Sequence, residues 1–204
     1  MPLFKSAHEA LRFAYNYNGD NCVKAIIGIP PAPTGRGLGG LDGAGEAGNI
    51  KRVAEGISKQ VTDWVWATYL PNRIPCHCGR RCCQGWEENV QWSNAVVEMA
   101  KLVFGSGRIL ITKQYFSEKA YRLPVYKIAQ IESISERQAY YLLKTVVTFF
   151  RGTRKQRGVG QVFMDALDKE LRKSGIVGDI ETDEDVNVWN LQDARRLLTP
   201  RFTV

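Results

Sequence analysis

Apolar residues recur at helical spacing in several parts of this 204-residue chain, and short polar or glycine-containing stretches separate these parts. Ser6 and Glu9 have the spacing of a capping box, which predicts a helix over residues 7–17. Asp42 is placed to cap a second helix, which is predicted to run to Tyr69. The apolar stripe expected along this second helix consists of Ile50, Val53, Ile57, Val61, Trp64, Val65 and Thr68.

Two more amphipathic patterns lie farther along the chain. Residues 86–104 predict a helix that glycines 105 and 107 end, and its expected apolar side is Trp86, Val90, Val97, Ala100 and Phe104. A last helix is predicted from Val159, and its inward residues are Phe163, Met164, Leu167 and Leu171. Residues 23–29 form a short apolar run that fits either a strand or a buried turn of helix. The pattern as a whole predicts a mainly α fold.

A proline- and glycine-rich segment, residues 30–48, separates the first two helices, and we interpret it as a linker. It also contains Gly35, Gly37 and Gly40 in GxGxxG spacing. The alternative interpretation of the segment is therefore a nucleotide-binding loop. In a dinucleotide site this motif begins directly after a strand, so that the pyrophosphate meets a helix N-terminus. Here residues 30–34 intervene, which favours the linker.

Residues 123–158 contain two helical patterns separated by a short break. Pro124 suits the first turn of the first helix, whose apolar face is Ile128, Ala129 and Ile131. The break falls at Glu132-Ser133, and the second helix is predicted to begin at Glu136 and to bury Ala139, Leu142, Leu143 and Val146. Two helices joined by such a turn form a helix-turn-helix, whose second helix enters the DNA major groove. A plain buried helical hairpin is the alternative.

This pattern resembles the helix-turn-helix in region 4 of bacterial sigma factors and related regulators. The matching features are a small residue where the helices cross, an apolar residue after the turn, a capping serine and an inward face, held here by Ala129, Ile134, Ser135, Ala139 and Leu142. The chain departs from that pattern at Ser133, where glycine is frequent. The resemblance implies a protein that binds double-stranded DNA.

Positive charge is concentrated in the same region. The net charge of the chain is +7, whereas residues 101–157 carry 12 basic and 3 acidic side chains. Such a local field attracts polyanions, and nucleic acid is the commonest of them in a cell, although a solvated basic face would have the same composition. An acidic run, residues 179–186, is interpreted as a solvated loop, with a protein-contact surface or an intramolecular cover for the basic segment as alternatives.

The exposed positions of the second helix are the candidates for DNA contact. Arginine pairs bidentately with guanine and glutamine with adenine, so Arg137 and Gln138 are expected to read bases. Contacts with backbone phosphates are expected from Tyr141 and Lys144, and Tyr140 is a further exposed candidate on the same helix. A basic extension follows and would supply salt-dependent affinity without sequence information, with glycines 152 and 158 letting the chain follow a groove; its residues are Arg151, Arg154, Lys155 and Arg157.

Four of the five cysteines fall within eight positions, in the pattern C-x-C-x3-C-C. Thiolates are good ligands for zinc, and cysteines of a cytosolic protein are kept reduced. We therefore expect a structural zinc knuckle, with partly buried cysteines that bind no metal and a redox or vicinal disulfide switch as alternatives. No His-x-Glu or HExxH pattern lies nearby, so a catalytic zinc is not expected. The expected metal ligands are Cys76, Cys78, Cys82 and Cys83.

The chain is therefore expected to comprise an N-terminal helical region (1–75), a cysteine-rich loop and helix (76–104), the helix-turn-helix with its basic extension (105–158), and a C-terminal helix with an acidic tail (159–204). This combination resembles the late-gene antitermination proteins of lambdoid phages, which bind DNA and engage RNA polymerase, although the two separated C-x-x-C pairs of that family are absent.

We expect a cytoplasmic, non-enzymatic transcription regulator, because the sequence has no signal-peptide pattern, no membrane-spanning apolar run and no evident catalytic constellation. The alternatives are a phage accessory protein of DNA packaging or recombination, and an enzyme that uses a metal or a nucleotide.

Overall fold

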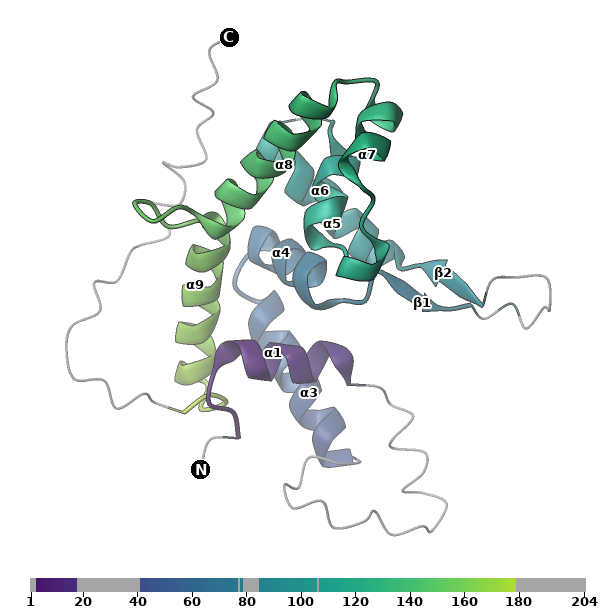
Figure 1. The fold of residues 1–204 in the computed structure, drawn as a ribbon. Coiled ribbons are helices and arrows are strands. Elements are labelled where there is room, and N and C mark those ends of the chain that lie inside the picture. Colours follow the sequence, from purple (N-terminus) through teal and green to yellow (C-terminus); the bar gives the residue numbers. More distant parts are fainter. Residues whose placement is uncertain (1–2, 18–40, 77, 79–84, 106, 179–204) are drawn as a thin grey trace. The chain divides into compact units, whose positions relative to one another are not determined.

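The computed structural model describes residues 3–17, 41–76, 78, 85–105 and 107–178. Within these residues the chain is mainly helical, as predicted, with eight α-helices, one short 3-10 helix and one two-stranded antiparallel sheet (Figure 1). None of the described helices is long and apolar enough to cross a bilayer. The chain divides into two compact units, Met1–Thr62 with Leu167–Glu181 and the remainder, and each is described by itself.

The first unit is built around α1 (Ala7–Asn16), which packs against α3 (Leu41–Glu55). Ser6 caps α1 as predicted, because its hydroxyl accepts a hydrogen bond from the Glu9 backbone N–H at 3.3 Å. The apolar side of α1 is fully buried, and the Tyr15 hydroxyl donates to the Glu55 carboxylate at 3.1 Å. The unit is completed by a bridge between Phe4 and Val177, which ties the start of the chain to the segment after the last helix.

Two predictions about the glycine-rich segment and the helix after it are wrong. The predicted linker, residues 30–48, is helical from Leu41 onward, so Asp42 lies inside α3 rather than at its cap. The predicted single helix ending at Tyr69 is two helices, α3 and α4 (Lys59–Tyr69). The Ser58 hydroxyl accepts from the backbone N–H two residues inside α4 and so begins a new helix there. In the expected stripe, Thr68 is exposed, whereas Ile50, Val61, Trp64 and Val65 are buried.

The second unit contains a β-hairpin where a helix start was predicted. Strands β1 (Arg73–Pro75) and β2 (Trp86–Glu88) pair antiparallel, and α5 (Val90–Phe104) begins only after Asn89. The Asn89 side chain accepts from the backbone N–H groups of residues 91 and 92 and sets the start of the helix. The predicted apolar side is therefore wrong at Trp86 and Val90, which are exposed, and the buried side is Trp92, Ala95, Val96, Met99, Ala100 and Val103.

After glycines 105 and 107, which have positive φ, α6 (Ile109–Phe116) packs against α5, α7 and α8. A 3-10 turn, η1 (Lys119–Tyr121), leads to α7 (Val125–Glu132), α8 (Glu136–Arg151) and α9 (Val159–Lys173), whose residues from Leu167 onward belong to the first unit. Phe150 of α8 is buried between Tyr115 and Phe116 of α6, with ring centroids at 5.3 and 5.0 Å. The inward residues predicted for α9 are confirmed for Phe163, Leu167 and Leu171. This packing holds α8 across α6 and leaves its other side open.

Candidate nucleic-acid interface

The turn between α7 and α8 has the geometry that the sequence predicted. Only Ser133, Ile134 and Ser135 join the two helices, and Ser133 has φ 54° and ψ 45°, in the left-handed region. The Ile134 backbone N–H donates to the Ala129 carbonyl at 3.0 Å, which closes the end of α7. Ala129 and Ala139 are both buried where the helices meet, at 4% and 0% exposure. The predicted inward face of α7 is wrong at Ile131, which is 62% exposed.

A complete capping box starts α8 and changes the role expected for Gln138. The Ser135 hydroxyl accepts from the Gln138 backbone N–H at 3.2 Å, and the Gln138 side-chain oxygen accepts from the Ser135 backbone N–H at 3.0 Å. Both groups satisfy backbone donors that the helix itself leaves unpaired. Gln138 is thus held at the helix start, where its side-chain oxygen is already engaged.

The outer side of α8 carries a line of cations and aromatic rings. Arg137, Tyr141 and Lys144 follow one another at spacings of four and three residues, so they share one face of the helix. The Arg137 guanidinium lies 5.7 Å from the centroid of the Tyr141 ring, within cation-π range. Tyr140 and Tyr141 are 58% and 51% exposed, and their rings meet edge to face at 6.1 Å. In the part of the chain that the structure describes, no carboxylate forms an ion pair with Arg137 or Lys144.

The inward side of α8 matches its prediction in part. Ala139 and Val146 are fully buried, and Phe150 is buried beside them. Leu142 and Leu143 are only half-buried. The contact residues predicted for the second helix therefore lie on α8, whose opposite side is anchored in the core of the second unit.

The basic extension is a closed turn rather than a chain that follows a groove, so the role predicted for its glycines is wrong. Gly152, with φ 79°, and Gly158 lie so close that a Cβ on Gly152 would come within 2.4 Å of the Gly158 nitrogen. A backbone bridge between residues 152 and 157 and a 2.7 Å hydrogen bond from the Thr153 N–H to the Gln156 carbonyl close the turn. Only glycine fits at positions 152 and 158, where the two ends of this turn are in contact.

The four cations of the extension have different surroundings. Arg151 lies over the Tyr115 ring at 5.8 Å. Burial raises the pKa of the Tyr115 hydroxyl, and the neighbouring Arg151 guanidinium partly offsets this rise. Arg157 forms an ion pair with Asp165 of α9 at 2.7 Å. Arg154 and Lys155 lie at the exposed tip of the turn, and no described carboxylate pairs with either. These two are the cations most available to a polyanion.

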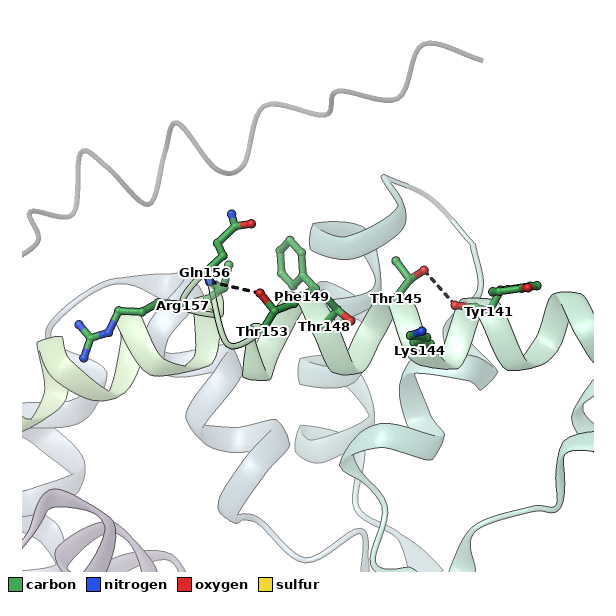
Figure 2. A pocket seen from close by; sticks show the side chains of 10 residues that line it. Tyr141, Lys144, Thr145, Thr148, Phe149, Thr153, Gln156 and Arg157 are labelled. Carbon is green, nitrogen blue, oxygen red and sulfur yellow. Dashed lines mark hydrogen bonds between the residues drawn. The ribbon is translucent and has the colours of Figure 1, made fainter.

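A groove of about 500 Å³ runs along the second half of α8 and the closed turn (Figure 2). Its apolar part comes from Tyr141, Phe149 and Val159, and its basic part from Lys144 and Arg157. Helical spacing places the α8 residues on one wall of the groove, and the closed turn with the start of α9 forms the other wall. No local sequence pattern shows which surface of α8 faces residues 152–159, so the groove cannot be recognised from the sequence.

The cysteine-rich segment lies between β1 and β2. Cys76 is half-buried directly after β1, its backbone N–H donates to the Gly85 carbonyl at 2.9 Å, and the Cys78 N–H points to the Cys76 sulfur at 3.4 Å. The other two expected ligands, at positions 82 and 83, lie outside the described residues. Among the described residues no three histidine, cysteine or acidic side chains gather as a metal site.

The Lys113 ammonium of α6 pairs with Glu88 of β2 at 2.6 Å and fastens the hairpin to the helical core. This hydrogen bond holds the pKa of the Glu88 carboxyl below its usual range, against a smaller opposing effect of burial. The hairpin is thus held at its base, because Glu88 pairs with Arg73 at the start of β1, whereas the cysteine segment leaves β1 at the opposite end, after Pro75.

Comparisons of this chain with family models, with curated proteins and with solved structures give no match.

Proposed function

We propose that this protein is a sequence-specific double-stranded DNA-binding transcription regulator that acts in the cytoplasm of a bacterial cell. The observation that carries the proposal is the turn from Ser133 to Ser135, which joins α7 to an α8 whose outer side is cationic and aromatic. A buried alanine on each helix lets the two approach closely at this turn. In helix-turn-helix proteins the second helix of such a pair lies in the major groove.

Within this arrangement Arg137 is the main candidate for base reading. It lies in the first turn of α8, and the Tyr141 ring beneath it limits the directions that its guanidinium takes. A guanidinium held in this way is suited to the two acceptors of guanine. Gln138 is the weaker candidate, because its side-chain oxygen is engaged at the helix cap. It would have to give up that hydrogen bond to pair with adenine.

The closed turn supplies the second part of the proposed interface. Arg154 and Lys155 lie beyond the C-terminal end of α8, where they would meet phosphates outside the bases that Arg137 reads. Phosphate contacts release counterions, so these residues contribute affinity that falls steeply with salt and does not depend on sequence.

The test is selection of random and genomic duplex DNA on the purified full-length protein at near-physiological salt. Retained fragments are expected to share a motif, and retention without any motif would contradict sequence-specific binding. Arg137→Ala should lower discrimination among sites by about 1–3 kcal/mol, whereas Lys155→Ala should weaken all binding and flatten the salt dependence. Lys169→Ala, at an exposed cation of α9, is the matched control and should change neither. Equal effects of the first two variants on all sequences would refute the base-reading role of Arg137.

A narrower proposal within this class is a phage late-gene antiterminator that also engages RNA polymerase. It draws on the combination of a cysteine-bearing hairpin with the α7–α8 pair that follows it later in the chain. An accessory protein of DNA packaging or recombination would use the same surface to hold DNA without altering transcription. A reconstituted transcription assay separates the two, because only the antiterminator lengthens transcripts past a terminator.

A further inference from the structure

We infer that the C-terminal segment of this chain, residues 183–191, docks into the groove along α8 and the closed turn. The segment begins with three consecutive carboxylates, Asp183, Glu184 and Asp185, and continues with Val188, Trp189 and Leu191. The groove and its rim have the complementary composition. Exposed cations at 154 and 155 lie on the turn, and an apolar wall follows along α8.

The order of these features along the tail matches their order on the surface. The turn directly precedes α9, so its cations lie at the end of the groove from which a chain returning along α9 would approach. Carboxylates met first would pair with Arg154 and Lys155. The apolar residues that follow would then reach Phe149 and Tyr141, farther along α8.

The length of the tail fits the same path. The backbone N–H groups of Ile176 and Val177 both donate to the Leu171 carbonyl, at 3.0 and 3.3 Å, so the chain turns back onto the end of α9. From Leu171 to Val159 the helix measures about 18 Å at 1.5 Å per residue. An extended chain advances about 3.3 Å per residue, so the residues between Gly178 and Asp183 cover most of this length and Asp185 exceeds it.

Groups already in the groove leave the basic side chains accessible to carboxylates. The Thr145 hydroxyl donates to the Tyr141 carbonyl at 3.0 Å within its own helix (Figure 2), so it does not compete for the tail. Lys144 has no ion-pair partner among the described residues. Arg157 already has Asp165 as a partner, so the tip of the turn and Lys144 are the expected anchors for the acidic part.

Docking of the tail would cover cations that the proposed DNA-binding surface needs, a consequence that depends on the proposed function. DNA and the tail would then compete for one surface. If the tail covers this surface for nine-tenths of the time, removal of its charge should raise apparent DNA affinity about tenfold.

Hydrogen exchange of the full-length protein without DNA tests the docking itself. Backbone amides of residues 186–191 should exchange more slowly in the natural protein than in a variant with Asp183→Asn, Glu184→Gln and Asp185→Asn. Trp189→Ala should also remove this protection. Charge reversal at the turn, Arg154→Glu with Lys155→Glu, should abolish protection, and the addition of Asp183→Lys, Glu184→Lys and Asp185→Lys should restore it. Lys119→Glu, at an exposed cation of η1, is the matched control and should leave exchange unchanged.

Tail amides that exchange at the rate of an unstructured peptide in the natural protein would overturn the inference. Protection that survives the neutralised tail would overturn it as well, and protection that grows with protein concentration would assign the groove to the tail of a second copy. These hydrogen-exchange measurements are made without DNA, so their outcome tests the docking independently of the proposed function. If neither the natural protein nor the variant with the neutralised tail retains DNA, the proposed function is overturned and the docking of the tail is unaffected.

Discussion

Replacement of Gly152 by alanine tests the description of the closed turn. Two separate costs are expected. The backbone at Gly152 has φ 79° and ψ −169°, a region that is essentially restricted to glycine, and a side chain there costs about 1–3 kcal/mol. The new Cβ would also lie 2.4 Å from the Gln156 carbonyl oxygen and from the Gly158 nitrogen. Both neighbours are backbone atoms, so relief requires movement of the turn, which adds about 1–3 kcal/mol as in overpacked cores.

Gly105→Ala is the control that separates the two costs. Gly105 has φ 73°, but a Cβ there would meet no atom within 4 Å, so only the conformational cost applies. Guanidinium unfolding followed by circular dichroism should give free energies of unfolding for both variants and for the natural protein. Gly152→Ala should be less stable than Gly105→Ala by the overpacking cost, about 1–3 kcal/mol. Equal losses for the two variants would refute the close approach of the two glycines.

Three further predictions concern the hairpin. Asn89→Ala should lower the free energy of unfolding by about 1 kcal/mol, because a capping side chain of α5 is lost, and an unchanged denaturation midpoint would contradict this. Lys113→Met should raise the pKa of Glu88 toward its usual value of 4.5 in an NMR titration. Because the pKa of the paired carboxyl is lowered in the folded protein, the pair stabilises the fold above pH 4.5. The loss of stability in this variant should therefore be largest above pH 4.5 and should disappear as the pH falls through the lowered pKa of Glu88. A chelator should lower the melting temperature if zinc is bound by the expected ligands, and metal-free protein with an unchanged melting curve would exclude a structural zinc held by Cys76, Cys78, Cys82 and Cys83.

The features that were predicted correctly depend on residues close together in sequence. Ser135 and Gln138 satisfy each other's backbone groups across three positions, so the start of α8 is visible without knowledge of the fold. The same is true of Ser6 at the start of α1. Local hydrogen bonding therefore made the turn between α7 and α8 the most predictable part of the candidate site.

The errors arise where distant segments decide the outcome. Strand β2 has no alternation of polar and apolar residues and is exposed throughout, so only its pairing with β1 makes Trp86 part of a strand. Glycines lower the helix propensity of α3, yet burial of Ile50 and the alanines on either side of it against neighbouring elements is sufficient to form a helix. The groove beside α8 escaped prediction for the same reason, because its second wall belongs to a chain that has reversed direction.

The closed turn has a thermodynamic consequence for any polyanion that binds at Arg154 and Lys155. Ordering the backbone of one residue costs about 1–2 kcal/mol of free energy through lost conformational entropy. A disordered basic arm loses this entropy at the moment of binding. Here the two glycines and the bridge between residues 152 and 157 order the backbone during folding. Association at this turn should therefore show a smaller entropic penalty in calorimetry than association of a flexible arginine- and lysine-rich arm of equal charge.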